Sequence, residues 1–372
     1  MYNKTFFITG GGTGGHIYPA VAVADELIKN ENYDVFYIGN PENMEYRIAK
    51  DKGYKFLPIK VSGMPRKLSL NFILWSVQLF IAIIQAMYYI LKYKPNAIFG
   101  TGGYVSAPLL FASNILRQPN YMLHDCDIHP GIVTKTFASN AKCVSLAFDG
   151  AIKHLKGDNN CIVNGNPLRP EFKKVLKIDA KEELKLDINK PILCIMGGSQ
   201  GAKSINNSMV EILKELVEDH HYQIIFQTGE KNYEFITNRL SKIFKGHEKN
   251  KNLIIKPYFN NMVTILKASD IVISRAGSLS LSEIFASGIA PILVPYPHAA
   301  ADHQRKNAKF VQEHNACIYV EDEDTDPNYF LQLLIELKDD EARVKELKSN
   351  ASKLAKYDAL KNIVEQFERV SS

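Results

Sequence analysis

Cysteine is scarce in this sequence, and the few cysteines are scattered. The 372 residues contain five, an odd number, with no Cys-x-x-Cys pair. They are Cys126, Cys143, Cys161, Cys194 and Cys317. Disulfide-rich secreted domains and structural zinc sites both need cysteines in closely spaced sets, so this spacing excludes a disulfide framework and a cysteine zinc site. The sequence therefore predicts a protein of a reducing compartment.

The sequence also lacks a strong excess of one charge. Lys and Arg number 45 against 40 Asp and Glu, a net charge of +5, and the excess lies in residues 1–165. This bias fits attraction to an anionic substrate or surface but is too small to indicate nucleic-acid binding. Hydrophobic residues make up 46%, which excludes a disordered chain. The first residues lack the long apolar core of an export signal, so we expect a cytoplasmic protein.

The length and the pattern of apolar runs predict two α/β domains. Short apolar runs that alternate with helix-length segments are typical of parallel sheets with right-handed crossovers, and 372 residues suit two cores. The expected strands are Thr5–Thr9, Asp34–Ile38, Ala97–Phe99, Asn120–Leu123, Lys142–Ser145, Ile192–Met196, Gln223–Gln227, Asn252–Ile255, Ile271–Ser274 and Pro291–Val294. We expect two Rossmann-like doubly wound domains, residues 1–163 and 164–355, joined at the turn-forming Asn164–Pro167.

Three of the expected strands end in glycine-rich turns, which begin at Gly10, Gly100 and Gly197. Glycine lets a backbone approach a ligand closely, and the start of the following helix offers free N–H groups and a positive dipole end to phosphate. One such turn is common in α/β proteins. Three of them indicate a chain that handles more than one phosphorylated molecule.

The first turn, Gly10-x-Gly12-x-x-Gly15, matches the dinucleotide-binding fingerprint. That fingerprint also needs an acidic residue at the end of the second strand, where it binds the cofactor's ribose. Here the strand runs into Gly39-Asn40, so the contact is missing. A nicotinamide-dependent oxidoreductase stays open as a remote alternative.

Two polar residues beside these turns are candidates for chemistry. His16 follows the first turn directly, where an imidazole could act as a general base or donate to a phosphate. Glu283 lies early in the helix expected after Ile271–Ser274, where its carboxylate could accept both hydroxyls of a ribose. The alternatives are structural: His16 as a helix cap, and Glu283 as a residue favoured by the helix dipole.

One long apolar segment needs separate treatment. No charged residue occurs from Leu68 to Leu91, and a helix of this length would be about 36 Å long. Because the segment lies between two strands of one expected sheet, we interpret it as a crossover helix rather than a transmembrane span. A polar stripe divides it into two apolar faces, of which only one needs to be buried. Neighbouring protein covers the other, or it enters the membrane surface beside Arg66 and Lys67; we favour the membrane, with Trp75 and Leu79 as contacts.

Six motifs in collinear order together resemble a known family. They are Gly-Gly-Thr-Gly-Gly-His at 11–16, Gly-Gly-Tyr-Val-Ser-Ala-Pro at 102–108, Gly-Asn-Pro-Leu-Arg at 165–169, Gly-Gly-Ser-Gln-Gly-Ala at 197–202, Arg-Ala-Gly-Ser-Leu-Ser-Leu-Ser-Glu at 275–283 and His-Gln-Arg-Lys-Asn-Ala at 303–308. Each motif alone is weak, whereas the joint pattern is specific. The chain resembles the MurG-type peptidoglycan glycosyltransferases from residue 5 to about 310.

The resemblance implies the glycosyltransferase B fold, two Rossmann-like domains that face each other across a cleft. It implies inverting transfer of N-acetylglucosamine from UDP-N-acetylglucosamine to the 4-hydroxyl of the muramoyl sugar of lipid I, an undecaprenyl-linked acceptor, to give lipid II for peptidoglycan. No metal or other cofactor is expected. Residues 356–372 would form a helix that returns to the first domain. The enzyme would lie peripherally on the cytoplasmic face of the plasma membrane, through Leu68–Leu91 and nearby basic residues.

Carried over position by position, the resemblance also implies site residues. The donor residues are Arg169 and Ser199 at the diphosphate, the backbone of Phe259 at the uracil, Glu283 at the ribose, and Ser278, Leu279 and Gln304 in the sugar and nucleotide pocket. In the first domain, Thr13, Gly14 and Gly15 would meet the donor, and Gly102 and Gly103 would accept the acceptor's diphosphate. His16 and Asp125 are the two candidate bases, and the choice between them stays open.

The sequence departs from the family pattern at His124-Asp125-Cys126-Asp127, where the family has His-Glu-Gln-Asn. The family's asparagine can donate to the N-acetylglucosamine through its amide, whereas an ionised Asp127 can only accept. Either Asp127 accepts from a sugar hydroxyl or the donor preference has changed. Asp125 and Asp127 also form an Asp-x-Asp pair, a metal and nucleotide signature of another glycosyltransferase fold, and we discount a metal here.

Two rival functions remain besides the oxidoreductase. The departure at Asp127 leaves open a related UDP-sugar transferase with another lipid acceptor, such as diacylglycerol. A non-catalytic membrane adaptor is less favoured, because it would not explain three turns suited to phosphate.

Overall fold

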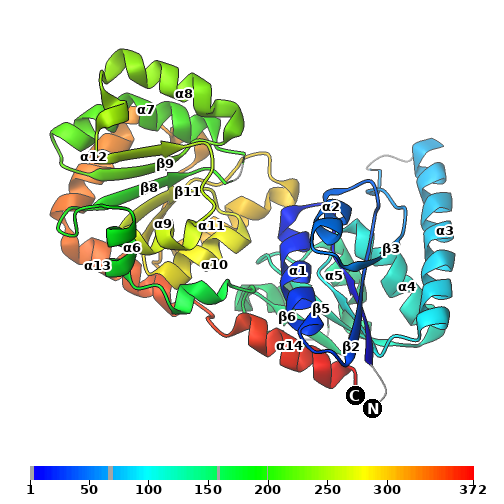
Figure 1. Cartoon of the computed structure of the whole chain (residues 1–372). Helices are drawn as coiled ribbons and strands as arrows, with labels where there is room; N and C mark the ends of the chain where they lie inside the picture. The colour runs from blue at the N-terminus through cyan, green and yellow to red at the C-terminus, as the bar shows by residue number, and fades with distance from the viewer. Residues whose placement is uncertain (1–3, 66–69, 157–159, 199) are drawn as a thin grey trace. The chain divides into compact units, whose positions relative to one another are not determined.

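The computed structural model describes residues 4–65, 70–156, 160–198 and 200–372. It divides into two compact units (Figure 1). The first unit comprises Met1–Pro167 with Asp358–Ser372, and the second comprises Leu168–Tyr357. Each unit has its own parallel sheet and its own core, which confirms the expected fold class of two Rossmann-like α/β domains.

The sheet of the first unit has the strand order β3-β2-β1-β4-β5-β6-β7 in the described part of the chain, and all neighbours are parallel. The strands are β1 Lys4–Thr9, β2 Tyr33–Gly39, β3 Lys55–Pro58, β4 Ala97–Gly100, β5 Asn120–Asp125, β6 Cys143–Leu146 and β7 Cys161–Val163. The α-helices are α1 Gly14–Ile28, α2 Met44–Asp51, α3 Leu70–Tyr93, α4 Ala107–Leu116, α5 Ile132–Phe137 and α14 Ala359–Val370. Short 3₁₀ helices cover Tyr104–Ser106, Ala138–Asn140 and Asp149–His154.

The second unit repeats the same winding, with the described strands in the order β10-β9-β8-β11-β12-β13, again all parallel. The strands are β8 Ile192–Met196, β9 Gln223–Gln227, β10 Leu253–Lys256, β11 Ile271–Ser274, β12 Ala290–Leu293 and β13 Ile318–Tyr319. The α-helices are α6 Lys177–Glu183, α7 Lys203–Glu218, α8 Glu230–Ile243, α9 Met262–Ala268, α10 Ser278–Ser287, α11 His303–Glu313, α12 Pro327–Asp339 and α13 Glu341–Lys353. The 3₁₀ helices are Pro170–Lys173, His247–Lys249, Ala300–Asp302 and Asp322–Asp324.

The ten strands expected from the apolar runs are all confirmed, with ends that differ by at most two residues. They are recognisable because helices cover both faces of a parallel sheet, so that central strands are apolar throughout, as in the fully buried β8. The strands not expected, β3, β7 and β13, each have four residues or fewer and lie at the edges of the described sheets. Their partly exposed residues leave no continuous apolar run to recognise.

The C-terminal helix α14 packs on the sheet of the first unit. Ile363 and Phe367 are fully buried, and the ring of Phe367 lies 5.1 Å from that of Phe6 on β1. At the helix end, Glu368 accepts a hydrogen bond of 2.8 Å from the hydroxyl of Tyr33. The last segment of the chain is thus part of the core that supports the first glycine turn.

The helix α3 is the crossover between β3 and β4, and it is unusually open. Among the described residues it is long and apolar enough to cross a membrane, yet only 11% of its most apolar stretch is buried. Figure 1 shows it on the outside of the first unit, beside α4. Ala82, Ala86 and Ile90 are buried against the core. The exposed apolar residues of the opposite face are Leu70, Ile73, Leu74, Val77, Phe80, Ile81, Ile84, Tyr88 and Leu91, which we call the open face of α3.

The expectation that Trp75 and Leu79 contact a membrane is wrong. Leu79 packs against the core, and the indole N–H of Trp75 donates to the carbonyl of Ser62 at 2.9 Å. The polar stripe helps to explain which face turns inward, because Gln78 and Gln85 bind the end of β3 and the chain that follows it. The hydroxyl of Ser62 donates to Gln78 at 2.9 Å, and Gln85 donates to the carbonyl of Pro58 at 2.9 Å. Arg66, Lys67 and Leu68, named with this surface, lie outside the described residues.

Candidate functional site

His16 lies in the first turn of α1 with its ring fixed by the main chain of the next glycine turn. Its Nδ1 lies 2.8 Å from the carbonyl oxygen of Thr101. A carbonyl can only accept, so Nδ1 carries the proton and the neutral ring keeps its lone pair on Nε2. The hydroxyl of Thr101 donates in return to the carbonyl of His16 at 2.5 Å. This arrangement gives His16 the tautomer that a general base needs.

The turn after β4 packs directly on His16, and this explains its two glycines. Gly102 and Gly103 have φ of +86° and +72°, which side chains rarely adopt. A Cβ at Gly103 would lie 2.4 Å from the carbonyl oxygen of Gly11, and one at Gly102 would lie 3.3 Å from Nδ1 of His16. The structure therefore brings His16 together with both glycine turns of the first unit.

The start of α1 is open to a ligand. Thr13 is exposed, while Gly14 and Gly15 are half-buried. These two glycines supply the first N–H groups of α1, which have no carbonyl acceptor within the helix. Figure 1 shows α1 beside the sheet of the first unit, and the turn before it leaves the carboxyl end of β1. An anion placed there would meet backbone N–H groups and the positive end of the helix dipole.

Glu45 on α2 is a residue of this site that sequence reasoning missed. It is 1% exposed, and its carboxylate accepts from the backbone N–H groups of Gly12 at 3.4 Å and Asn40 at 3.3 Å. A Cβ at Gly11 would lie 2.6 Å from this carboxylate. Glu45 thus braces the first glycine turn from behind. The only signal in the sequence was an acidic residue placed shortly after the second strand, which the dinucleotide fingerprint does not use.

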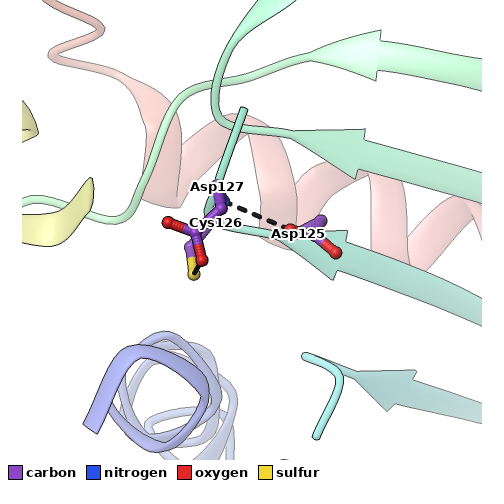
Figure 2. A group of neighbouring side chains, drawn as sticks. All are labelled: Asp125, Cys126 and Asp127. Carbon is purple, nitrogen blue, oxygen red and sulfur yellow. Dashed lines mark hydrogen bonds between the residues drawn. The ribbon is translucent and has the colours of Figure 1, made fainter. Parts of the chain in front are cut away.

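Asp125 ends β5 and organises the turn that follows. It is 2% exposed, and its two carboxylate oxygens accept from the backbone N–H of Asp127 at 3.2 Å, drawn in Figure 2, and of Gly131 at 3.0 Å. Burial raises the pKa of Asp125, and the neighbouring carboxylate of Asp127 raises it further. The preceding His124 is fully buried between Ser145 and Asn166, and burial lowers its pKa to about 4. Both residues shape the turn rather than face solvent.

The Asp-x-Asp pair does form a compact group with Cys126. The ligand atoms of Asp125, Cys126 and Asp127 lie within 4.8 Å of one another. Figure 2 shows the three side chains together after the end of β5. Asp127 is half-buried at the carboxyl end of the sheet, on the side of the start of α1, where a Cβ at Gly15 would lie 3.7 Å from the sulfur of Cys126. Each oxygen of Asp125 accepts one backbone N–H group, so this carboxylate has a structural role in the turn.

In the second unit, the structure brings Arg169 and Glu283 together. Their side chains form an ion pair of 3.2 Å, with 47% of Arg169 and 19% of Glu283 exposed. Glu283 lies in the second turn of α10, so the dipole at the helix start, which acts within the first turn, does not explain it. Burial raises the pKa of Glu283, and the guanidinium of Arg169 opposes the rise.

Ser278 and Leu279 form the first turn of α10, in the same unit and on the same helix as Glu283. Ser278 is 6% exposed and Leu279 is half-buried. The strand-to-helix turn before them is fixed by Arg275, which donates to the carbonyls of Val294 and Pro295 at 3.0 and 3.1 Å and pairs with Asp322 at 2.5 Å. Gln304, in the first turn of α11, accepts from the backbone N–H of Tyr296 at 3.0 Å.

Phe259 and the third glycine turn share one partner. The N–H of Phe259 donates to the side-chain oxygen of Gln227 at 3.0 Å, and the amide of Gln227 donates to the carbonyl of Gly198 at 3.1 Å. Sequence reasoning missed Gln227, which it treated only as the end of a strand. Ser199, the expected diphosphate contact, lies outside the described residues.

Comparisons with known proteins agree along the whole chain. Residues 6–146 match the glycosyltransferase family 28 N-terminal domain, and residues 192–363 match its C-terminal domain. A relative from Caldanaerobacter subterraneus subsp. tengcongensis, named "UDP-N-acetylglucosamine--N-acetylmuramyl-(pentapeptide) pyrophosphoryl-undecaprenol N-acetylglucosamine transferase", is 33% identical over 95% of this chain and 96% of its own. A relative of the same name from Desulforamulus reducens is 34% identical over 98% of both chains. The crystal structure of Acinetobacter baumannii MurG superposes with a TM-score of 0.79 at 26% identity, over 98% of this chain and 99% of the other.

Proposed function

The chain belongs to the MurG-type glycosyltransferases of glycosyltransferase family 28, and from this we propose that it moves N-acetylglucosamine from UDP-N-acetylglucosamine to undecaprenyl-diphospho-muramoyl-pentapeptide. The observation that carries the proposal is the near full-length identity to relatives named for this reaction. The product would be lipid II, and the enzyme would thereby serve peptidoglycan synthesis, cell shape and cell division.

We assign donor binding to the second unit. The ionised carboxylate of Glu283 would accept from the two ribose hydroxyls, and Arg169, which the ion pair holds beside it, would turn to the diphosphate. The backbone of Phe259 would read the uracil edge, and Ser199 would contact the diphosphate. Ser278, Leu279 and Gln304 would line the sugar and nucleotide pocket.

We assign the acceptor and the proton transfer to the first unit. His16 is the better base of the two candidates, because its Nε2 carries the lone pair while the oxygens of Asp125 are occupied and buried. Nε2 would remove the proton of the 4-hydroxyl as the oxygen attacks the anomeric carbon, and UDP would leave with inversion. Gly102 and Gly103, together with the start of α1, would accept the diphosphate of the lipid.

We propose that no metal takes part. The leaving diphosphate gains negative charge, and in this chain a guanidinium and the N–H groups at helix starts can stabilise it. In the second unit, Arg169 and the start of α7, which follows the third glycine turn, would provide these groups.

We propose a peripheral position on the cytoplasmic face of the plasma membrane. The open face of α3 presents nine large apolar side chains to solvent, and its last turn holds Lys92 with its ammonium group 5.5 and 5.2 Å from the rings of Tyr88 and Tyr93. Aromatic and basic residues at the end of an apolar surface suit the boundary between lipid headgroups and acyl chains. The lipid-linked acceptor would then reach the first unit from the membrane.

One observation favours a second candidate, a related transferase with another UDP-sugar or a lipid acceptor such as diacylglycerol. Asp127 stands where the family carries an asparagine that can donate to the N-acetyl group, and a carboxylate there can only accept.

Transfer of labelled sugar from UDP-N-acetylglucosamine to a short-chain lipid I analogue, with and without EDTA, tests these assignments. We expect transfer that resists the chelator. Loss of transfer with EDTA would assign a metal to Asp125 and Asp127. Transfer from another UDP-sugar alone, or to diacylglycerol alone, would establish the second candidate.

A further inference from the structure

Gln227, the last residue of β9, connects two loops that are far apart in the sequence. It is 2% exposed. Its amide nitrogen donates to the carbonyl of Gly198 in the third glycine turn at 3.1 Å, and its oxygen accepts from the N–H of Phe259, after β10, at 3.0 Å. Only a side chain with one donor and one acceptor on the same group can make both bonds, and an amide is such a group.

The two loops differ in their surroundings. Gly198 has φ of +79°, and a Cβ built on it would have no described atom within 4 Å, so this part of the turn faces open space. Phe259 is 4% exposed and lies under the ammonium group of Lys256 at 5.6 Å from the ring centre, so its backbone position is fixed by packing. The loops follow the carboxyl ends of β8 and β10, the two strands that flank β9, and nucleotides bind at this end of doubly wound sheets.

We infer that Gln227 is a positioning residue that sets the spacing between the backbone that reads uracil and the turn that receives the diphosphate. This inference rests on the donor site of the proposed function. A nucleoside diphosphate engages both loops at once, so its binding depends on their separation. A nucleoside monophosphate ends short of the second phosphate and depends on it less. Gln227 itself contacts neither group of the nucleotide in this assignment.

The chain supplies a matched control on the same strand. Gln223 begins β9 and is 1% exposed. Its side chain makes the same pair of bonds to another loop, since it donates to the carbonyl of Asp187 at 2.8 Å and accepts from the N–H of Asp187 at 2.7 Å. It lies at the opposite edge of the sheet. Replacing either glutamine therefore removes two hydrogen bonds of a buried side chain, and only the replacement of Gln227 affects the two loops at the carboxyl ends of the strands.

The experiment compares Gln227→Met with Gln223→Met by titration calorimetry with UDP and with UMP, and by KM and kcat for UDP-N-acetylglucosamine. For Gln227→Met we expect about a tenfold or greater loss of UDP affinity, a smaller loss for UMP, and a rise in KM that exceeds the fall in kcat. For Gln223→Met we expect affinities within about twofold of wild type. Thermal melting should show comparable losses of stability in both variants.

Equal UDP affinity in the two variants, or an equal loss for UDP and UMP in Gln227→Met, would overturn the positioning role. If Gln227→Met does not fold, Gln227→Glu serves, because an ionised glutamate keeps the bond from Phe259 and loses the one to Gly198; wild-type UDP affinity in that variant would also overturn the role. A wild-type chain that binds no UDP would remove the donor assignment of the proposed function itself, and the role of Gln227 with it.

Discussion

Arg169 and Glu283 are each other's partner, with 3.2 Å between guanidinium and carboxylate. They come from distant motifs, one directly after the first unit and one in α10, and both were expected to bind the donor. Because Glu283 is mostly buried, loss of this partner would leave a poorly solvated carboxylate behind. The ion pair therefore holds the carboxylate of Glu283, the proposed acceptor for the ribose hydroxyls, in place.

Replacing Glu283 with alanine should weaken UDP-sugar binding by roughly ten- to a hundredfold, because two charge-assisted hydrogen bonds to the ribose are lost. Arg169→Ala should also weaken binding. The double variant should lose less than the sum of the single losses in free energy, since each residue holds the other. Titration of the three variants with UDP measures this coupling, and wild-type affinity in Glu283→Ala would contradict the assignment.

Donor binding should also weaken in acid. Burial raises the pKa of Glu283 above its ordinary value of 4.5, so in the free protein this carboxylate takes up a proton at a higher pH than an exposed glutamate does. The protonated form cannot accept from both ribose hydroxyls equally well. UDP affinity should therefore fall as the pH drops through this raised pKa. In Glu283→Gln, the acid limb of the affinity profile should vanish; a limb that persists would come from another group.

For His16, the hydrogen bond to Thr101 suggests a variant sharper than alanine. The amide of His16→Asn can still donate to the carbonyl of Thr101, but it offers no lone pair on a basic nitrogen. Turnover should fall by about 10²- to 10⁴-fold while the KM for UDP-N-acetylglucosamine changes little. Steady-state kinetics with the lipid I analogue measures kcat and this KM separately. His16→Ala should likewise reduce turnover more than it weakens donor binding. Unchanged turnover would remove His16 from the chemistry.

Membrane binding should depend on the open face of α3 and not on the face that packs against the core. The variant Leu74→Ser with Ile81→Ser removes two exposed side chains and should reduce partition onto anionic phospholipid vesicles by about tenfold or more. Leu79→Ser is the matched control, because this residue packs on the core. It should lower the melting temperature and leave partition unchanged. Co-sedimentation of wild type and the two variants with vesicles measures the partition. Equal partition of the double variant and wild type would exclude the open face as the membrane contact.

The ion pairs of Asp270 should stabilise the second unit down to a low pH. Burial opposes ionisation of Asp270, yet the ammonium groups of Lys348, at 2.8 Å, and Lys177 lower its pKa to about 2 from an ordinary value of 3.8. A lowered pKa in the folded state gives stability that is complete above the unfolded value and is lost as the pH falls toward 2. Asp270→Asn should therefore cost about 2 kcal/mol at pH 7 and progressively less below about pH 4.

Chemical denaturation across this pH range measures the effect, with the exposed Asp179→Asn as control. Asp270 lies before β11, at the edge of the sheet opposite the donor residues, and it accepts from the N–H of Ile192. UDP affinity should therefore stay at the wild-type level in both variants. If the difference in stability between wild type and Asp270→Asn did not change with pH, the substitution would act through packing rather than through the lost charge.

The sequence predicted the sheets well because central parallel strands are apolar on both faces. It failed in α3, where both faces are apolar and the sequence pattern alone does not show which one turns inward. The contacts of Gln78 and Gln85 help to fix that orientation. It also missed Glu45 and Gln227. Their roles arise from loops that meet in space, and no spacing along the chain signals such contacts.

The pairing of Asp125 with backbone N–H groups shows the same limit. The motif reads as two acidic residues one apart, and this pattern suggests a ligand site, whereas the structure uses the first carboxylate to close a turn. Arg169 with Glu283, in contrast, was anticipated as a donor set through the family resemblance, although their direct contact was not.

The partner that orients the ring of His16 is a carbonyl of the main chain, and every amino acid carries one. An alanine scan would remove the side chain of Thr101 and leave this acceptor untouched, so the group that decides which ring nitrogen holds the proton is invisible to ordinary mutagenesis. Replacing the peptide bond after residue 101 with an ester, which has a weaker acceptor, would expose it. The side chain at position 101 can therefore change while the carbonyl that orients the imidazole stays the same.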